Sequence, residues 1–265
     1  MLALTTLPSL VSAGAQTVSS GVTITFLANE GVLLSTGDKK VLVDALFLRY
    51  ESGYALPADS TQTALARARP PFDGVHVVLV THRHGDHFHP APVAEHLRAN
   101  PAAVLVTSRQ VIDSLRYHIR PSSPSYARLV ARTTVPGRRR RESFNGVVIE
   151  VLGLPHGGRR HRAVEHLGFV IELAGRRVLH VGDTDVSEEV FAPLRLDTAR
   201  IDVALLPYWA LTNPESRRVV ERWIRPRQIV AFHVGEDETE KIPAEIRATM
   251  PGAVVFTRSL DARRW

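Results

Sequence analysis

Short runs of aliphatic residues, separated by turns rich in Gly and Asp, recur along most of the chain and predict β-strands. Near the start, turns at Gly31 and at Gly37-Asp38 separate three such runs, which predicts an antiparallel meander. Later runs alternate with amphipathic stretches, so strand, polar loop and helix follow one another. The expected strands cover residues 22–28, 31–35, 40–45, 77–80, 103–107, 146–154, 167–173, 177–181, 201–206, 228–232 and 253–256.

Proline and capping residues mark where the intervening helices begin or end. Pro70-Pro71 ends an Ala-rich helix, Pro90 suits the first turn of another, and Asn213-Pro214 begins a third. We find no internal repeat or linker, so a single α/β domain is the simplest account. The expected helices cover about residues 60–69, 90–100, 187–196 and 244–250, and two more begin at residues 108 and 213.

The first residues do not follow this pattern. Residues 1–15 hold a short apolar run and then Ala13-Gly14-Ala15, the small-x-small sequence that a signal peptidase accepts. The first basic residue is Lys39, so the positive charges that begin an export signal are missing. Residues 1–20 are therefore either the remnant of an export signal, which predicts a periplasmic or secreted protein, or a tail on a cytoplasmic one. The folded domain is expected at 21–265.

Composition and charge narrow the class of protein. A chain of 265 residues with 44% hydrophobic and 23% charged residues is typical of a globular protein, and no run of 18 apolar residues predicts a membrane span. The net charge of +6 would attract polyanions, but only three of the 33 basic residues are Lys, a bias that a GC-rich coding sequence also produces. The run Arg138–Arg141 is expected at a solvated hairpin tip. The absence of Cys excludes disulfides and thiolate metal sites.

Candidate metal ligands gather directly after the strand at 77–80, where residues 82–87 read HRHGDH. Three imidazoles and a carboxylate at this spacing form the usual ligand types for zinc. Three later strands also end in a ligand type, and these residues are His156, Asp183 and His233. The sequence therefore predicts a metal site built from several strand ends.

Other polar residues near these strands allow more than one interpretation. His161 and His166 are alternatives to His156, which we prefer because it directly follows a buried strand. Asp44 either caps a turn or hydrogen-bonds the ligand loop. The histidines without an expected metal role are His76 and His180, taken as structural, and His96 and His118, taken as lying at the surface or the core edge.

These motifs together resemble the metallo-β-lactamase superfamily of metal-dependent hydrolases. The resemblance extends from FLANEGVLLSTGDKKVLVDA at residues 26–45 to the last strand. It implies a four-layer αββα sandwich, with the site at one edge of the two sheets. It also implies two metal ions, the first held by His82, His84 and His156, the second by Asp86, His87 and His233, with Asp183 bridging both.

A ligand set of nitrogen and oxygen suits two Zn²⁺ ions, with Mn²⁺ or Fe²⁺ as alternatives. A hydroxide shared by two such ions is a nucleophile at neutral pH, and Asp86 is expected to orient it as the catalytic residue. The expected reaction is cleavage of an ester, lactone or phosphodiester bond in a small-molecule substrate. Among relatives, the chain looks most similar to lactonase-like and phosphodiesterase-like proteins.

Residues that contact the substrate are harder to predict. Phe88, Tyr208 and Trp209 are candidates for apolar pocket walls, and His89 for either a helix cap or the pocket rim. Arg159, with its neighbours Arg160 and Arg162, is a candidate for holding a phosphate or carboxylate, so the substrate is expected to be anionic. The segment 46–73 begins with a long loop, before the helix at 60–69, that contains Phe47, Tyr50 and Tyr54 and is either a lid or anchored to the core.

Two other functions compete with this hypothesis. The positive charge and Arg clusters favour a protein that binds or processes nucleic acid, but the intact ligand set does not, so nucleic acid is not the expected partner. An iron-dependent persulfide dioxygenase is harder to exclude from the ligands alone, but a zinc hydrolase remains the better interpretation. Flavodiiron oxidoreductases fit less well, because they typically have Glu where this chain has His84. Nothing in the sequence predicts an oligomeric state.

Overall fold

The structure, a computed structural model, describes residues 21–48, 53–54, 56–133 and 135–265. The expected N-terminal tail and Tyr50 lie outside these residues. The described strands form two seven-stranded sheets. The strands are β1 (Thr23–Ala28), β2 (Gly31–Ser35), β3 (Lys40–Val43), β4 (Val77–Leu79), β5 (Val104–Thr107), β6 (Leu129–Ala131), β7 (Arg139–Phe144), β8 (Val147–Gly153), β9 (Leu167–Leu173), β10 (Arg176–His180), β11 (Val203–Pro207), β12 (Gln228–Phe232), β13 (Val254–Val255) and β14 (Ala262–Arg264).

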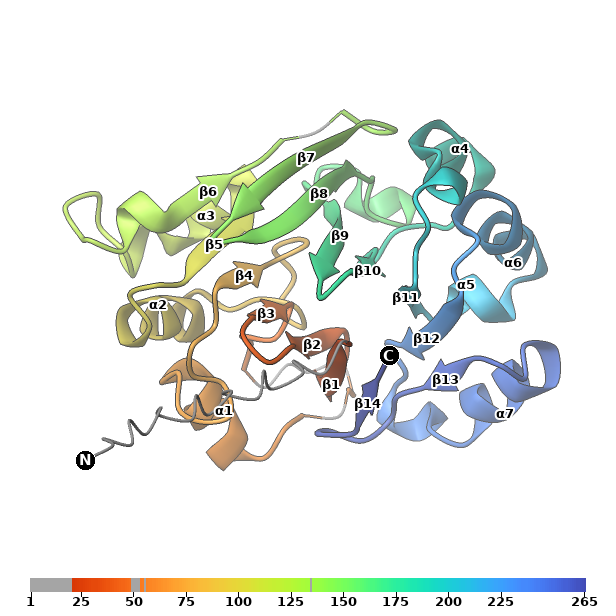
Figure 1. The fold of residues 1–265 in the computed structure, drawn as a ribbon, viewed down its shortest axis with the longest axis horizontal. Helices are drawn as coiled ribbons and strands as arrows, with labels where there is room; N and C mark the ends of the chain where they lie inside the picture. The colour runs from red at the N-terminus through yellow and green to blue at the C-terminus, as the bar shows by residue number, and fades with distance from the viewer. Residues whose placement is uncertain (1–20, 49–52, 55, 134) are drawn as a thin grey trace, which may run out of the picture.

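Helices cover the outer faces of both sheets, with α1, α2 and α3 beside the first sheet and α4 to α7 beside the second (Figure 1). None of the helices within the described residues is long and apolar enough to cross a membrane. The α-helices are α1 (Asp59–Ala66), α2 (Pro90–Ala99), α3 (Arg109–Ser114), α4 (Glu188–Phe191), α5 (Trp209–Thr212), α6 (Pro214–Val219) and α7 (Lys241–Thr249).

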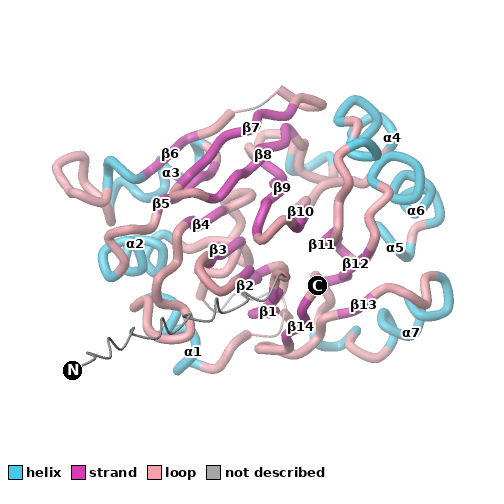
Figure 2. Tube along the Cα trace, viewed as in Figure 1, coloured by secondary structure: helices cyan, strands magenta, loops and turns pink. Residues whose placement is uncertain are grey.

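Three hydrophobic clusters separate the four layers. The central cluster contains residues of both sheets, such as Ile24 and Val77 from the first and Phe169 and Val203 from the second. A second cluster joins the second sheet to α4, α6 and α7, and a third joins the first sheet to α1, α2 and α3. Because each sheet buries both faces, the predicted αββα sandwich is confirmed (Figure 2).

Each sheet combines an antiparallel part with a parallel part. The first sheet has the order β14-β1-β2-β3-β4-β5-β6, and its strands run parallel from β3 to β6. The second has the order β13-β12-β11-β10-β9-β8-β7, and its strands run parallel from β10 to β13. The carboxyl ends of parallel strands meet at one sheet edge, so the loops after β4, β10 and β12 open at the edges of their sheets.

Several helices begin at the residues that the sequence indicates. Pro90 occupies the first turn of α2, as predicted. The Ser108 side chain accepts a hydrogen bond from the Val111 backbone N–H at the start of α3. Asn213 caps α6 in the same way, because its Oδ1 accepts from the backbone N–H groups of Glu215 and Ser216 at 2.8 and 3.1 Å.

The prediction of a solvated hairpin tip at Arg138–Arg141 is wrong. Residues 139 to 141 lie within β7, which pairs antiparallel with β8, and the turn follows at Asn145-Gly146. The strand lies at the edge of its sheet with exposed side chains, where arginines are tolerated. They also pair with carboxylates on the same sheet, since Arg139 and Arg141 lie 3.6 and 3.4 Å from oxygens of Glu150.

Other differences are smaller. The sequence did not predict β6, α5 or β14, each of only three or four residues. His96 was expected at the surface or core edge, but its side chain is fully buried. Its Nδ1 lies 2.6 Å from the Leu65 carbonyl oxygen, a hydrogen bond between α2 and α1 that makes burial of the imidazole acceptable.

Candidate metal centre

The candidate ligands are held at strand ends of both sheets. Val77, Val78 and Leu79 of β4 are buried, and the loop that follows carries residues 82–87. His156 follows β8. Asp183 follows β10 and His233 follows β12, in the second sheet. The buried strands thus fix the loops, and the loops bring polar side chains from distant parts of the sequence together.

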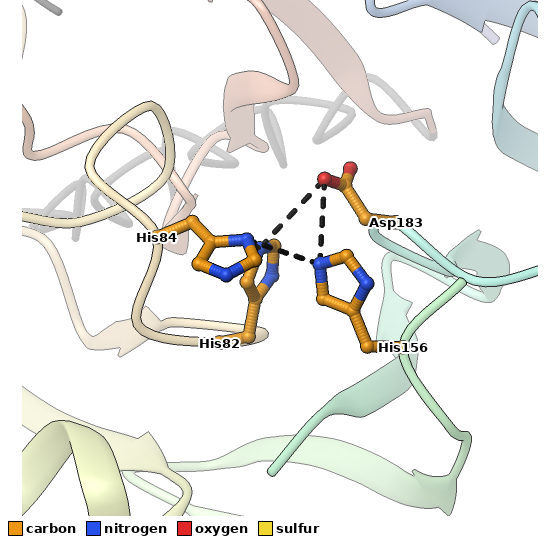
Figure 3. A group of neighbouring side chains, drawn as sticks. All are labelled: His82, His84, His156 and Asp183. Carbon is orange, nitrogen blue, oxygen red and sulfur yellow. Dashed lines mark hydrogen bonds and ion pairs between the residues drawn. The ribbon is translucent and has the colours of Figure 1, made fainter. Parts of the chain in front are cut away.

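A first group of side chains converges from three loops (Figure 3). His84 Nδ1 lies 3.1 Å from both His82 Nε2 and His156 Nε2. Asp183 Oδ2 lies 3.7 Å from each of the same two Nε2 atoms. One potential ligand atom from each of the four residues therefore lies within 4.8 Å of the others, a separation that suits a single metal ion between them.

A second group shares Asp183 with the first. Asp183 Oδ1 lies 3.2 Å from His87 Nε2 and 3.2 Å from His233 Nε2. Asp86 Oδ2 lies 3.7 and 3.9 Å from the same two nitrogens. The two oxygens of Asp183 thus face different groups, which is the arrangement of a bridging carboxylate.

The electrostatics of the two groups suit a cation. Burial lowers the pKa of His82, His84 and His156, that of His84 to about 4, which favours the neutral imidazole. In a neutral imidazole one ring nitrogen keeps its proton and the other has a lone pair that can bind a metal. Burial also opposes charge on His87, but the nearby carboxylate of Asp183 and the hydrogen bond to Asp44 raise its pKa well above the ordinary value. A positive charge is therefore favoured where His87 meets Asp183.

Unpartnered atoms also indicate a missing ligand at this point. His87 Nε2, His233 Nε2 and Asp183 Oδ1 are all buried without a hydrogen-bond partner among the described residues. Buried polar atoms rarely stay unpaired, and these three face one another. The residues present therefore fit a metal ion.

Asp44 hydrogen-bonds the ligand loop, which is the second of its two predicted roles. Its Oδ1 accepts from the Thr81 backbone N–H at 2.8 Å, and its Oδ2 accepts from the Thr81 hydroxyl at 2.6 Å. Oδ2 also lies 2.9 Å from His87 Nδ1. Because a proton on Nδ1 satisfies this contact, the lone pair of His87 is left on Nε2, which faces Asp183.

Backbone contacts join the loops that carry His156 and Asp183. The Gly157 N–H donates to the Asp183 carbonyl oxygen at 2.6 Å, and the Gly158 N–H donates to Asp185 Oδ2 at 3.0 Å. Gly182 has a φ of +60°, and a Cβ there would lie 2.6 Å from His166 Nε2. Glycine is therefore required immediately before Asp183.

Of the three histidines considered for the first group, His156 is the one whose nitrogen converges with His82 and His84. The His161 ring lies beside them, with its centroid 4.7 Å from that of His156, but outside the group. His166 is buried behind the His82 ring, and burial lowers its pKa to about 3. His180 is structural, as predicted, since its Nε2 lies 3.0 Å from the Glu30 carbonyl oxygen.

The predicted substrate residues lie in different surroundings. The Trp209 ring lies edge-on to His233, with centroids 4.9 Å apart, and Tyr208 lies edge-on to Trp209. Arg159 is exposed in the short 3-10 helix η3 (Arg159–His161) that follows His156. Phe88, in contrast, is 3% exposed within the hydrophobic cluster beneath α2, so it packs in the core instead of forming a pocket wall.

His89 lies at the N-cap position of α2, but its side chain does not cap the helix. Instead its Nδ1 accepts a hydrogen bond of 2.9 Å from the Leu48 N–H. The side chain thereby fixes the loop after β3 to the loop after β4.

Three further residues lie next to the second group, and only one of them, Tyr54, is named from the sequence, in a loop that is either a lid or anchored to the core. The Tyr54 ring lies edge-on to His233, with centroids 4.7 Å apart, and burial together with the charge of Asp86 raises the pKa of its hydroxyl. Asn29 Nδ2 donates to Asp86 Oδ2 at 3.2 Å. Glu30 is fully buried, and its Oε2 lies 4.0 Å from His87 Nδ1. Two polar residues in the apolar run TFLANEGVLL were the available signal for Asn29 and Glu30.

The four-layer sandwich and this His/Asp site at the strand ends define a hydrolase of the metallo-β-lactamase superfamily. Residues 39–259 match the family described as the beta-lactamase superfamily domain, and the chain belongs to this family.

Curated relatives and solved structures agree with this assignment. The chain is 28% identical over 240 residues to a UPF0173 metal-dependent hydrolase of Pelotomaculum thermopropionicum, covering 87% of this chain and 92% of the relative. Its identity to a Thermus thermophilus UPF0173 metal-dependent hydrolase is 26%, over 80% and 83% of the two chains.

Two solved structures show the same fold. The metallo-beta-lactamase fold protein YhfI of Bacillus subtilis gives a TM-score of 0.61 at 12% identity, over 93% of this chain and 100% of that one. The isothiocyanate hydrolase from Delia radicum gut bacteria gives a TM-score of 0.60 at 15% sequence identity, and the match covers 92% of this chain and 99% of that one.

Proposed function

We propose that this protein is a dinuclear zinc hydrolase that cleaves an ester, lactone or phosphodiester bond in a small-molecule substrate. The observation that carries the proposal is the position of Asp183, whose two carboxylate oxygens face two separate groups of ligand atoms. The first ion would be held by His82, His84 and His156, and the second by Asp86, His87 and His233. Zinc suits these ligands because all of them offer nitrogen or oxygen and none offers sulfur.

Zinc in such a site supplies Lewis acidity and makes water a nucleophile near neutral pH. The chain's own residues hold the geometry. Asp44 orients His87, and Asn29 restrains Asp86 through the hydrogen bond to its Oδ2. Asp86 has a second oxygen free of that bond, so we assign it the task of orienting the attacking water. The tied backbones of Gly157 and Asp183 keep the two groups at a fixed separation.

The surroundings of the site support a small organic substrate. Tyr54 and Trp209 each contact the His233 ring, so aromatic surface adjoins the second group. Arg159 is exposed on the turn after His156, on the side of the first group, where a guanidinium can meet an anionic oxygen of the scissile group. The substrate would then lie across Asp183, between these two features.

Metal analysis and a substrate panel test the proposal together. The purified full chain should hold about two zinc ions and should cleave at least one of a set of chromogenic ester, lactone and phosphodiester substrates. His82→Ala and His233→Ala should each lower the zinc content to about one ion per chain and reduce kcat/KM more than about 100-fold, because each removes a direct ligand.

His118→Ala is the matched control, because this histidine is exposed and lies outside both groups. It should leave zinc content and activity unchanged. Full activity with one ion per chain, or in the His233→Ala variant, would contradict a dinuclear mechanism. Preferential loading with iron, with activity only in the iron form, would contradict the assignment of zinc.

A further inference from the structure

A cavity of about 910 Å³ lies between the loop after β10 and helices α5 and α6. Asp185 and Ser187 line it from the loop, Trp209 from α5, Arg218 from α6, and Trp223 from the π-helical turn η6 (Val220–Ile224). Cavities of roughly 300 to 1,000 Å³ bind drug-sized ligands. This cavity is therefore large enough for an organic group well beyond the scissile bond.

Two residues that line this cavity, Trp209 and Asp185, also contact the loops that carry the metal ligands. The Trp209 ring contacts His233, and Trp209 Nε1 donates to the Thr184 carbonyl oxygen at 3.2 Å. Asp185, two residues after Asp183, accepts the hydrogen bond from Gly158. The cavity therefore adjoins the metal centre, with Trp209 and Asp185 lying between them.

The residues that line the cavity carry a net negative charge, although the protein as a whole is positively charged. The lining contains four carboxylates and two guanidiniums, a net charge of −2, whereas the whole chain carries +6. One guanidinium is already engaged, since Arg222 Nη1 lies 3.5 Å from Glu188 Oε1 and its Cζ lies 4.9 Å above the Trp223 ring. The charged lining residues are Asp185, Glu188, Glu215, Glu221, Arg218 and Arg222.

Carboxylates next to indole rings form a favourable environment for a positive charge. An indole face attracts cations through its quadrupole, and nearby carboxylates add Coulomb attraction, while an anion would be repelled. The cavity offers the Trp209 indole, because Arg222 already lies over the Trp223 ring. It also offers Glu215 and Glu221, which are not engaged in any ion pair among the described residues.

We propose that this cavity binds an organic cation, the positively charged end of the substrate. The role as a substrate subsite rests on the proposed hydrolase function, but the binding site itself does not. The substrate would then carry its scissile bond at Asp183 and an ammonium or similar group beyond Trp209.

Two probes of equal shape, one charged and one neutral, show how much of the binding affinity comes from the positive charge and not from size. Choline and 3,3-dimethylbutan-1-ol differ only in the quaternary nitrogen that replaces a carbon. Isothermal titration calorimetry on the zinc-loaded full chain should show choline binding about tenfold more tightly, the range expected for cation–π and partly exposed charge contacts. Equal binding of the two probes, or tighter binding of the alcohol, would overturn the proposal.

Variants locate the effect in the cavity. The double variant Glu215→Gln and Glu221→Gln keeps the side-chain size and should remove most of the preference for choline. Glu95→Gln on α2, on the other side of the molecule, is the control and should retain it. Ser216→Trp fills the cavity and should weaken both probes, provided that its Tm matches the wild type; unchanged choline binding in this variant would refute the location.

An ester hydrolysis assay distinguishes a failure of the cation site from a failure of the proposed hydrolase function. Zinc-loaded protein should cleave acetylcholine with a KM about tenfold below that of 3,3-dimethylbutyl acetate, at similar kcat. If choline is preferred but neither ester is cleaved, the cation site stands and ester hydrolysis fails. If both esters are cleaved with equal KM and choline is not preferred, the hydrolase stands and the cation site fails.

Discussion

Asp44 illustrates how one buried carboxylate positions a whole ligand loop. Its two oxygens accept from the backbone and the hydroxyl of Thr81, and one of them contacts His87 Nδ1. The residue has a φ of +45°, a conformation that Asp adopts more readily than most residues. The strand therefore ends at Val43, and the next residue turns its side chain toward the site.

Asp44→Asn tests this role. The amide cannot match the carboxylate charge, so His87 should lose its preferred tautomer and orientation, and zinc affinity of the second group should fall about 10- to 100-fold. Titration against a competing chelator measures the change. Asp38→Asn is the control, because Asp38 is exposed and its carboxylate accepts, among the described residues, only from the Thr36 hydroxyl. A similar loss in this variant would contradict the specific role of Asp44.

At the level of residues, the sequence predicts the candidate metal ligands better than it predicts the residues around them. The residues that form the two groups are those whose spacing and strand-end positions single them out. Tyr54 and Glu30 could not be assigned, because their proximity to the site depends on how distant loops fold together. Phe88 was assigned to a pocket wall because its sequence neighbours are ligands, yet consecutive residues in a loop can point to opposite sides.

Among the elements, β7 shows how an exposed edge strand is maintained by charge pairs. Its arginines and Glu142 face partners on neighbouring segments of the chain. Arg132 Nε lies 2.6 Å from Glu142 Oε2 and Arg132 Nη2 lies 2.8 Å from Oε1, a bidentate pair between the loop after β6 and β7. The basic run is therefore largely paired, which leaves less of it available for polyanions.

Glu142→Gln should lower stability in a pH-dependent way. The hydrogen bond from Arg132 holds the pKa of Glu142 below its ordinary value, so the ionised carboxylate stabilises the fold. That contribution, about 0.5 to 1 kcal/mol for a largely surface pair, is complete above the unfolded pKa of about 4.3 and is lost as pH falls through the lower folded pKa. Urea unfolding at pH 7 and pH 3 measures it.

The free energies of unfolding of the wild type and of Glu142→Gln should differ at pH 7 and converge at pH 3. Asp113→Asn, which breaks the exposed pair with Arg109 on α3, should change stability less at either pH. A difference for Glu142→Gln that persists at pH 3 would mean that packing, and not charge, is responsible.

The sequence predicted the strands with a strong apolar pattern and missed the exposed strands at the sheet edges. The buried runs of β4, β9 and β12 are apolar and bounded by polar loops, so their positions follow from the sequence. The edge strands β7 and β14 are exposed and rich in arginine, because only one of their edges is paired. Their strand conformation comes from the neighbour they pair with, which no local pattern reveals.

On the scale of the molecule, the two sheets share one core and one site. The central cluster contains residues of both, and the second group of ligand atoms combines His87 of the first sheet's loop with His233 of the second. Neither sheet, with its helices, can bury the face that packs against the other sheet, and neither can complete the metal site alone. A single domain at 21–265 stays a prediction, and unfolding experiments can test it.

Thermal unfolding should show one transition whose midpoint depends on zinc. Circular dichroism follows both sheets, whereas in a Trp265→Phe variant the fluorescence of Trp209 and Trp223 follows the side of the second sheet. Coincident curves would indicate cooperative unfolding. Zinc at about 100 times its dissociation constant stabilises by about 2.7 kcal/mol per site, which should raise Tm by about 5 to 10 °C for one filled site and about twice that for two. Two separated transitions would contradict a single domain. A Tm insensitive to chelator would contradict the metal site.

The pairing of β14 with β1 brings the two ends of the described fold together. Val22 and Trp265 exchange both backbone hydrogen bonds, each of 2.9 Å. A short peptide would therefore join residue 265 to residue 22 and close the domain into a ring. Opened instead at the Ala174-Gly175 turn, where a Cβ added to Gly175 would meet no atom within 4 Å, such a circular permutant would retain every strand pairing of both sheets.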